Sequence, residues 1–430
     1  MTEATPSFEN SLEYAKQQDN NDTLKHFREK FHLPLTPSGN PEIYFCGNSL
    51  GLQPKNTREE ILFELDKWQR LGVRGHFEDK FPWMPYHENL TPHAASLVGA
   101  KDHEVVIMNS LTANLHFMMV SFYQPNKNRH QIMIEDHAFP SDHYAVESQI
   151  KHHGFSPDES LVLLKPREGE ELLRTEDILQ RIDEHRDSLA LILLPGLQYY
   201  TGQLLDIKTI TQHAQQYDIV VGVDLAHAAG NVPLKLHDWN VDFACWCNYK
   251  YLNSGPGAVG GCFVHERHAK NTDLVRFAGW WGHDKASRFQ MENHFKPIAS
   301  AEGWQLSNPP ILSLTAIRAS YEVFAEAGGV ERLREKSLRL TGYLEFLLKD
   351  QLPEQVTIIT PSNTHERGCQ LSLSVALADK EGKAIHNDMI AAGISCDWRE
   401  PNVIRVAPVP LYNNFEDVHR FTETLKELLA

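Results

Sequence analysis

The middle of the chain alternates between short, uninterrupted apolar runs and longer segments whose apolar residues recur every three or four positions. The apolar runs lie at residues 105–108, 131–135, 161–164, 189–194, 219–223 and 243–247. The segments with helical spacing lie between them, at residues 110–123, 141–152, 175–185 and 207–217. Continuously apolar strands are typical of a sheet with helices on both faces. The pattern therefore predicts an α/β fold of three layers with a mostly parallel central sheet.

The two ends of the chain have a different pattern. Residues 1–40 are polar and mixed, and we expect them to be partly helical. Toward the C-terminus a helical region is expected over residues 313–348, with a break at Gly328 and Gly329. Further elements are expected as a strand at 43–46, a helix at 56–71, strands at 356–360 and 371–375, and helices near 383–392 and 415–429. We therefore expect an N-terminal segment (1–75) that packs on the small domain and the active site, a large domain (76–312), and a smaller α/β domain (313–430).

Composition and charge narrow the classes of function. The chain has 430 residues and a net charge of −16, and this acidic balance disfavours binding to nucleic acids or anionic membranes. No apolar run approaches the roughly 20 residues that a membrane span needs. The first residues lack a basic stretch followed by an apolar one, so we expect no signal peptide and a cytoplasmic location. Six cysteines are too few for a disulfide scaffold, and we expect buried, reduced thiols.

Candidate chemistry gathers where the predicted strands end. Asp224 follows the run at 219–223, and Lys250 follows the run at 243–247 and precedes a Gly-rich loop. Thr112 lies at the start of a predicted helix. Because the carboxyl ends of parallel strands meet at one edge of a sheet, where ligands of open α/β folds bind, we expect these side chains to line one site.

This set meets the needs of pyridoxal 5'-phosphate, an aldehyde cofactor. Lys250 offers an amine that can bond to the aldehyde, and Asp224 can keep the pyridine nitrogen protonated. The amides of Leu111 and Thr112 at a helix N-terminus suit the phosphate, and Phe139 can stack on the ring. Further polar side chains near these positions are Asp142, His227 and Tyr249. Each residue alone also has an ordinary structural interpretation, such as a solvated loop lysine or a helix cap, so the prediction depends on their combination.

Several longer motifs resemble the kynureninase family over residues 43–425. They are YFCGNSLGLQP (44–54), NSLTANLH (109–116), FPSD (139–142), YYTGQ (199–203), VDLAHAAGNVPL (223–234), NYKYLNSGPGAVGG (248–261), GWWGH (279–283), SNPPILS (307–313) and IRVAPVPLYN (404–413). The resemblance implies the fold type I (aspartate-aminotransferase-like) architecture of pyridoxal-phosphate enzymes, and a homodimer with shared active sites. It also implies hydrolysis of L-kynurenine or 3-hydroxy-L-kynurenine to L-alanine and the corresponding anthranilate, in tryptophan breakdown and NAD biosynthesis.

The resemblance also implies a role for individual residues. Lys250, Asp224 and Tyr249 are the implied catalytic residues, and Arg405 is the implied partner of the substrate α-carboxylate. The implied cofactor-binding residues are Leu111, Thr112, Phe139, Pro140, Ser141, Asp142, Asp224, His227, Tyr249, Lys250, Trp280 and Asn308. The implied substrate-binding residues are Arg405, His76, Ser49 and Asn308, with Trp280 and Asn308 reaching the site from the partner subunit. Pro195 departs from the family pattern, since some relatives have a serine there. Arg405 also has a structural interpretation, as an ion-pair partner within an apolar strand.

Three other activities remain as alternatives at this point. Gly47-Asn48-Ser49-Leu50-Gly51 matches the G-x-S-x-G elbow of serine hydrolases, although no earlier strands supply the rest of that fold. A cysteine desulfurase of the same fold would need a reactive loop thiol, and Cys369 and Cys396 are the candidates. An aminotransferase shares the early chemistry. The 23 histidines form no metal-binding motif, so we expect scattered surface histidines and no metal.

Overall fold

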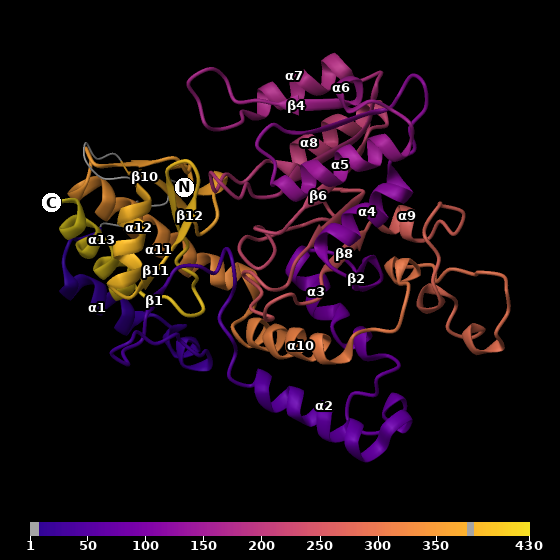
Figure 1. Cartoon of the computed structure of the whole chain (residues 1–430), viewed down its shortest axis with the longest axis horizontal. Helices are drawn as coiled ribbons and strands as arrows, with labels where there is room; N and C mark the ends of the chain where they lie inside the picture. Colours follow the sequence, from indigo (N-terminus) through magenta and orange to yellow (C-terminus); the bar gives the residue numbers. More distant parts are fainter. Residues whose placement is uncertain (1–7, 376–381) are drawn as a thin grey trace.

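A seven-stranded sheet forms the centre of the larger part of the molecule (Figure 1). The computed structural model describes residues 8–375 and 382–430. Along the sheet the strand order is β2-β8-β7-β6-β5-β3-β4, and β8 alone runs antiparallel to its neighbours. The strands are β2 (Val105–Ile107), β3 (Gln131–Glu135), β4 (Leu161–Leu164), β5 (Leu189–Pro195), β6 (Val220–Asp224), β7 (Phe243–Trp246) and β8 (Gly261–Val264). The prediction of a mostly parallel sheet is confirmed.

Helices cover both faces of this sheet. Alternate residues of each strand point to opposite sides, so both faces present side chains for the helices to pack against. On one face, residues such as Val106 and Ile134 pack with helices α4 and α5. On the other face, residues such as Val221 and Val223 pack with helices α3, α7, α8 and α10. The bounds of these helices are α3 (Thr91–Val98), α4 (Leu111–Phe122), α5 (Pro140–His152), α7 (Thr175–His185), α8 (Ile207–Ala214) and α10 (Ile311–Glu326). The three-layer prediction is confirmed.

A smaller unit lies beside the large one and has a separate hydrophobic core. Its antiparallel sheet has the order β12-β13-β10-β9, and the N-terminal strand β1 pairs with β11 in a second, two-stranded sheet. Helix α1 packs against α13 and belongs to this core, whereas Leu24, Phe27 and Phe31 further along the N-terminal segment pack in the core of the large unit. The bounds are α1 (Leu12–Asn21), β1 (Ile43–Tyr44), α11 (Gly329–Gln351), β9 (Val356–Ile358), β10 (Leu371–Val375), α12 (Gly382–Ala391), β11 (Ile394–Ser395), β12 (Asp397–Arg399), β13 (Val403–Val406) and α13 (Phe415–Leu429).

Helix α10 packs with the large unit. Its residues Leu314, Ile317 and Phe324 join the core of the central sheet, and its outer side receives α2 (Thr57–Leu71). Gly328 and Gly329 then separate α10 from α11 with φ angles of 89° and 83°, which only glycine adopts at low cost. The first turns of α11 still pack in the core of the large unit through Val330 and Leu333, and from Leu340 onward α11 belongs to the core of the small unit.

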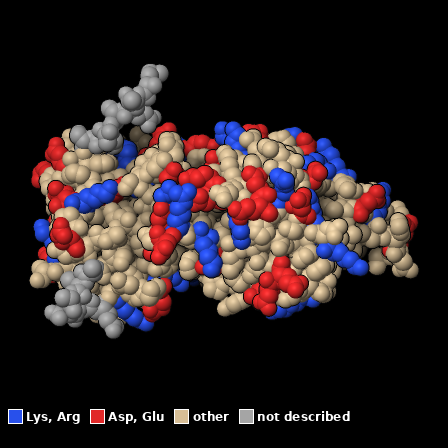
Figure 2. Space-filling view, turned by 90° about the horizontal axis from the view of Figure 1, so that it is seen from above, with Lys and Arg blue, Asp and Glu red and all other residues tan. Residues whose placement is uncertain are grey.

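The surface carries acidic and basic side chains in alternation. On the face shown in Figure 2, Lys and Arg lie among Asp and Glu, and no broad basic field is visible. In the part of the chain that the structure describes, no helix combines the length and apolar character needed to span a bilayer.

Candidate active site

A cavity of about 340 Å³ lies at the carboxyl ends of the central strands. The side chains predicted from the sequence that line it are Ser49, Leu111, Thr112, Phe139, Ser141, Asp142, Asp224, His227, Tyr249, Lys250 and Arg405. They come from at least five separate segments, and the strand topology brings them together. Pro140 begins helix α5 between two of them. Pro195, at the end of β5, also lines the cavity.

Lys250 projects into this cavity beside a buried histidine. Its Nζ lies 3.0 Å from His227 Nε2 and 5.8 Å from the centroid of the Phe139 ring. Burial lowers the pKa of His227 well below its ordinary value, so the imidazole is neutral. His227 Nδ1 is buried and has no hydrogen-bond partner within the described chain. The pair therefore presents an amine and an unsatisfied ring nitrogen to the cavity.

Three buried carboxyl groups surround the inner end of the cavity. Asp224 accepts a hydrogen bond of 2.6 Å from the backbone N–H of Ala226, and it shares a second hydrogen bond with Asp142. Burial, and then the charge of Asp224, raise the pKa of Asp142 well above its ordinary value, so Asp142 holds the shared proton. Glu135 accepts from Gln198 Nε2 at 3.2 Å, and burial raises its pKa to about 7. Burial raises the pKa of Asp224 as well, but the hydrogen bonds from Asp142 and the Ala226 N–H and the charge of Lys250 oppose that rise, so Asp224 is the member of the pair that carries the negative charge.

The opposite end of the cavity has hydrogen-bond donors. Ser110 begins helix α4 without a side-chain cap hydrogen bond, so the first-turn amides, including those of Leu111 and Thr112, remain available as donors. Thr112 Oγ1 lies 2.8 Å from Ser141 Oγ, next to the N-terminus of α5. Two helix N-termini and two hydroxyl groups are hydrogen-bond donors of the kind that bind a phosphate group.

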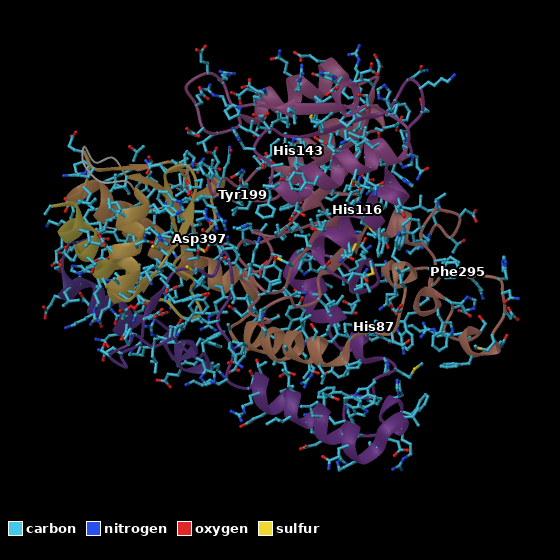
Figure 3. All side chains as sticks on the ribbon, in the orientation of Figure 1. His87, His116, His143, Tyr199, Phe295 and Asp397 are labelled. Atoms are coloured by element: carbon cyan, nitrogen blue, oxygen red, sulfur yellow. The ribbon has the colours of Figure 1, made fainter. Side chains whose placement is uncertain are left out.

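Arg405 reaches the cavity from the smaller unit. Its side chain is fully buried on β13, and Nη1 donates to the carbonyl oxygen of Tyr199 at 2.8 Å. Asp397 forms ion pairs with both Arg405, at 2.8 Å, and Arg399, at 3.2 Å. Figure 3 shows Tyr199 and Asp397 at the junction of the two units. Two guanidinium groups share one carboxylate, so the arrangement keeps one net positive charge beside the cavity.

Some residues lining the cavity were not predicted. Glu135 follows a predicted strand and Tyr199 lies in a quoted motif, so the signals that marked Asp224 apply to them as well. Arg399 had no local signal, because only the pairing of β12 with β13 brings it next to Arg405. The unpredicted lining residues are Asn48, Ser110, Glu135, Leu197, Tyr199, Ala226, Gly257, Ala258 and Arg399.

Three predicted residues do not line this cavity. His76 is half-buried, and its Nδ1 lies 3.0 Å from the carbonyl oxygen of Val73. Trp280 is 43% exposed and donates to the carbonyl oxygen of Arg288. Asn308 is also exposed. Their roles stay predictions that require a second copy of the chain or a movement of these loops.

The residues present fit pyridoxal phosphate. The buried Asp224 carboxylate suits a cationic ring nitrogen, the unpartnered Nδ1 of His227 suits a polar ring substituent, and the exposed face of Phe139 suits stacking. Lys250 supplies the amine, and the helix N-termini supply the phosphate site. The cavity therefore has a complementary group for each end of the cofactor.

The alternative chemistries lack support at the same positions. None of the hydrogen bonds among the described residues joins the Ser49 hydroxyl to a histidine, so a nucleophile and base pair is not formed. Cys369 is buried, and burial raises the pKa of its thiol to about 12. Cys396 is buried as well, and burial raises its pKa further. Neither thiol has the exposed, thiolate-stabilising setting of a reactive cysteine.

Known proteins resemble the chain in both sequence and structure. A family model described as the kynureninase C-terminal domain matches residues 333–425. Kynureninase of Koribacter versatilis is 53% identical over 98% of both chains, and that of Myxococcus xanthus is 55% identical over 97% of both. Kynureninase of Nematostella vectensis is 50% identical over 96% of this chain and 93% of its own.

Solved structures share the fold at lower sequence identity. An apo cysteine desulfurase from Thermococcus onnurineus has a TM-score of 0.76 at 18% identity and covers 94% of this chain and 98% of its own. A C-DES variant with glycine covalently linked to its PLP cofactor has a TM-score of 0.75 at 16% identity, covering 93% of this chain and 98% of its own. These likenesses establish the fold type of pyridoxal-phosphate enzymes, and the near full-length identity above 50% to curated relatives shows that the chain belongs to the kynureninase family.

Proposed function

We propose that this protein hydrolyses L-kynurenine, 3-hydroxy-L-kynurenine or both, to L-alanine and anthranilate or 3-hydroxyanthranilate. The observation that carries the proposal is the convergence of Lys250, the buried Asp224 and Arg405 on one cavity. An amine, an anion and a cation at these places match the aldehyde and the ring nitrogen of the cofactor and the carboxylate of an amino-acid substrate. The names of the relatives support the same reaction.

In this proposal the large unit holds the cofactor. Lys250 binds it covalently, Asp224 keeps its ring nitrogen protonated, and Leu111, Thr112 and Ser141 donate to the phosphate. Bound there, pyridoxal phosphate supplies an aldehyde that bonds to amines and a cationic ring that withdraws electrons from the substrate. Because Asp142 holds the proton between the two aspartates, Asp224 keeps its negative charge for the ring nitrogen.

Lys250 then moves protons at the substrate. With a substrate bound in the cavity, Lys250 Nζ would remove the proton from Cα. Neutral His227, 3.0 Å away, accepts a hydrogen bond from Nζ and keeps it directed into the cavity. Tyr249 lies next to Lys250, and burial raises the pKa of its phenol, so the hydroxyl stays protonated and can donate to the substrate carbonyl that water attacks.

Arg405 is proposed to bind the substrate α-carboxylate. The guanidinium groups of Arg399 and Arg405 carry two positive charges against the single negative charge of Asp397. A substrate carboxylate would neutralise the remaining charge in a buried setting, where such a pair is strong. The fixed Arg405 would thereby direct the α-carbon toward Lys250.

The experiment combines product analysis with chemical trapping. Purified protein incubated with L-kynurenine should release alanine and anthranilate in equal amounts. Borohydride reduction followed by peptide mass spectrometry should find the cofactor on Lys250. Lys250→Ala should abolish turnover, whereas Ser49→Ala should only reduce it. A modified lysine elsewhere, or loss of all activity in Ser49→Ala with normal cofactor binding, would refute the assignment.

We also propose a homodimer in which Trp280 and Asn308 of a second copy complete each site. The exposure of both side chains supports the idea, since each leaves surface that a second copy can cover. His76 and Ser49 are proposed to contact the aryl group of the substrate. A cytoplasmic role in tryptophan breakdown and NAD biosynthesis is part of the same proposal, and it rests on the family resemblance.

A further inference from the structure

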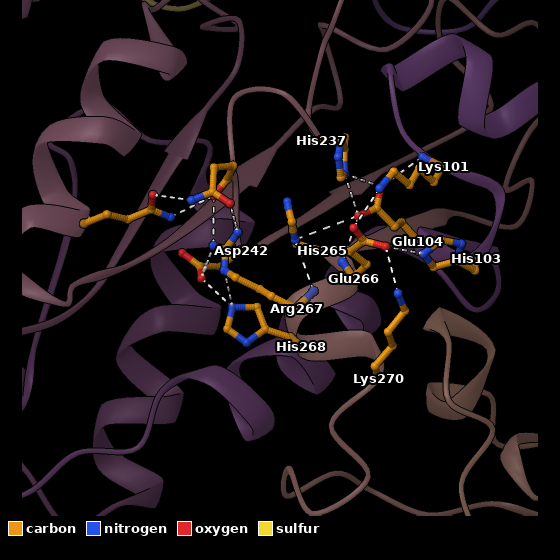
Figure 4. Close-up of polar contacts among 12 residues, drawn as sticks. Lys101, His103, Glu104, His237, Asp242, His265, Glu266, Arg267, His268 and Lys270 are labelled. Atoms are coloured by element: carbon orange, nitrogen blue, oxygen red, sulfur yellow. Dashed lines mark hydrogen bonds and ion pairs between the residues drawn. The ribbon is translucent and has the colours of Figure 1, made fainter.

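A buried polar side chain is normally satisfied by partners in its own chain. Figure 4 shows an example at the sheet edge where β2 and β7 begin, away from the cofactor cavity. Both oxygens of Glu104 accept backbone N–H groups, and Oε1 also lies 2.9 Å from His237 Nδ1. His265 Nδ1 accepts the backbone N–H of Arg267 at 3.2 Å. The expectation of only surface histidines is wrong here, since His265 is buried. Such a cluster is complete without a ligand.

The side-chain amide of Asn48 differs, because only one of its two polar atoms has a partner. Asn48 is fully buried and lines the cofactor cavity. Its Nδ2 donates to Gln370 Oε1 at 2.8 Å, whereas its Oδ1 has no hydrogen-bond partner within the described chain. A buried acceptor without a donor destabilises a fold, so its presence in the wall of a cavity indicates a ligand that supplies the donor.

A backbone carbonyl group fixes the orientation of this amide. The carbonyl oxygen of Tyr199 can only accept, and it accepts from Gln370 Nε2 at 3.0 Å. Gln370 must therefore turn Oε1 toward Asn48, and Asn48 must turn Nδ2 toward Gln370. Asn48 Oδ1 is the atom that this relay leaves over. The position consequently suits a ligand group that carries an N–H or O–H, and it does not suit a second acceptor such as a carboxylate oxygen.

Asn48 lies on a short segment that is attached near Arg405 at one end and near Lys250 at the other. The carbonyl oxygen of Phe45 accepts, at 3.0 Å, the backbone N–H that directly follows β13, the strand that carries Arg405. The backbone N–H of Gly51 donates, at 2.8 Å, to the carbonyl oxygen of the residue before Lys250. The segment therefore holds Asn48 between the proposed anchor of the substrate carboxylate and the proposed attachment point of the cofactor.

An α-amino acid fits this order of groups. Its carboxylate needs a cation, which Arg405 supplies, and its amino group must approach the cofactor at Lys250. Because the amino group and the carboxylate share one carbon, the amino group lies between these two residues, as Asn48 does. The carboxylate and the ketone oxygen of kynurenine are acceptors, and its aryl amine is at the far end of the molecule. The α-amino group is thus the substrate donor that Asn48 Oδ1 can meet.

We propose that Asn48 binds the α-amino group of the substrate, whose N–H donates to Oδ1 while Arg405 binds the carboxylate. The inference rests on the proposed function and adds a substrate-binding residue to it. An amide oxygen accepts a hydrogen bond without taking the proton, so Asn48 orients the amino group toward Lys250 without changing its charge. Together the two residues distinguish an α-amino acid from a carboxylic acid that has the same aryl ketone.

The test measures binding and not turnover. Borohydride reduction of the holoenzyme fixes the cofactor on Lys250, so that ligands enter the cavity without reacting. Titration calorimetry then gives the Kd of L-kynurenine and of 4-(2-aminophenyl)-4-oxobutanoic acid, which is the same molecule without its α-amino group. Both ligands are measured with the wild type, Asn48→Ala and Asn413→Ala. Asn413 is the matched control, because it is a buried asparagine outside the cavity lining and both atoms of its amide have partners.

We expect the wild type to bind L-kynurenine more tightly than the analogue by about 10-fold or more, as for a hydrogen bond from a charged group. Asn48→Ala should lose most of this ratio by weakening L-kynurenine alone, and Asn413→Ala should keep the ratio of the wild type. Equal affinities in the wild type, or equal weakening of both ligands in Asn48→Ala, would overturn the proposal. The wild-type comparison decides the matter even where the variant fails to fold.

The same preparations separate this inference from the function on which it rests. If the unreduced wild type does not hydrolyse L-kynurenine, the proposed function is refuted and the role of Asn48 with it. If hydrolysis is intact and the two ligands bind equally well, only the role of Asn48 is refuted.

Discussion

Replacing Glu135 by glutamine should make the stability of the protein less dependent on pH. Glu135 ends β3 with 4% of its surface exposed, and the anion Asp224 lies near it. The side-chain amide of its partner Gln198 cannot flip and is held with Nε2 toward Glu135, because Gln198 Oε1 accepts the backbone N–H groups of Tyr200 and Thr201. Burial raises the pKa of Glu135 from 4.5 to about 7 in the folded protein. The folded chain therefore holds a proton on Glu135 that the unfolded chain has already lost between these two pH values.

The size of the effect follows from the linkage between protonation and folding. At about 1.4 kcal/mol for each pH unit, the rise in pKa corresponds to about 3 kcal/mol. Because the folded-state pKa is the raised one, this stability is fully present below pH 4.5 and is lost as the pH rises through 7. Glutamine resembles the protonated acid, so Glu135→Gln should match the wild type at low pH. At pH 8 the variant should be the more stable by up to about 3 kcal/mol.

The assay is guanidinium unfolding of the cofactor-free protein at several pH values from 5 to 8. The quantity of interest is the difference in unfolding free energy between variant and wild type, which should grow as the pH rises. Glu159→Gln is a matched control, because Glu159 is exposed beside β4 and its replacement should leave the difference flat. A difference that stays constant with pH for Glu135→Gln, or that favours the wild type at pH 8, would refute the reasoning.

Three further predictions concern the substrate, the thiols and the packing of the sheet. Arg405→Lys should lower kcat/KM for kynurenine by about 100-fold, because losing the bidentate contact to the substrate carboxylate costs roughly 3 kcal/mol. The cofactor absorbance should be retained, and unchanged kinetics would exclude the carboxylate role. Cys369→Ala should keep most of the activity, and thiol alkylation of the native protein should not inactivate it; rapid inactivation that the variant resists would revive the desulfurase alternative. Gly222→Ala should lower the free energy of unfolding by about 1 to 3 kcal/mol or more, the usual cost of overpacking a core. A Cβ on residue 222 would lie 2.1 Å from the Phe243 ring. Adding Phe243→Leu should restore part of that stability in chemical unfolding, and a fully stable Gly222→Ala would contradict the packing.

Elements with a long and regular pattern could be predicted closely from the sequence. The predicted bounds of β4, α7, β10 and α13 agree with the structure, because an apolar run or a helical period fixes each one locally. Strand β8 was missed, since Gly260 and Gly261 interrupt its apolar run. The structure explains these glycines: a Cβ on Gly261 would lie 2.1 Å from the Trp246 ring. The close approach of two strands is a tertiary property that the sequence pattern does not carry.

The residues of the candidate site also fall into those that could be predicted from the sequence and those that could not. Lys250, Asp224 and Thr112 could be found because each follows a predicted strand or begins a predicted helix. Arg399 could not, because its place depends on the pairing of β12 with β13 in the other unit. The protonation of Asp142 and Glu135 also required the structure, since burial and the distance to a neighbouring anion set both.

The large and small units are joined by hydrogen bonds at residues 199–201, the segment that also contacts Arg405, the proposed anchor of the substrate carboxylate. Three consecutive carbonyl groups, those of Tyr199, Tyr200 and Thr201 in the large unit, accept hydrogen bonds from the small unit. Arg405 is one of the donors to Tyr199. The groups proposed to hold the cofactor all belong to the large unit, whereas the proposed carboxylate anchor belongs to the sheet of the small unit. The distance between cofactor and substrate carboxylate is therefore set by these tethers, so a substitution that loosens them should weaken substrate use while cofactor binding remains intact.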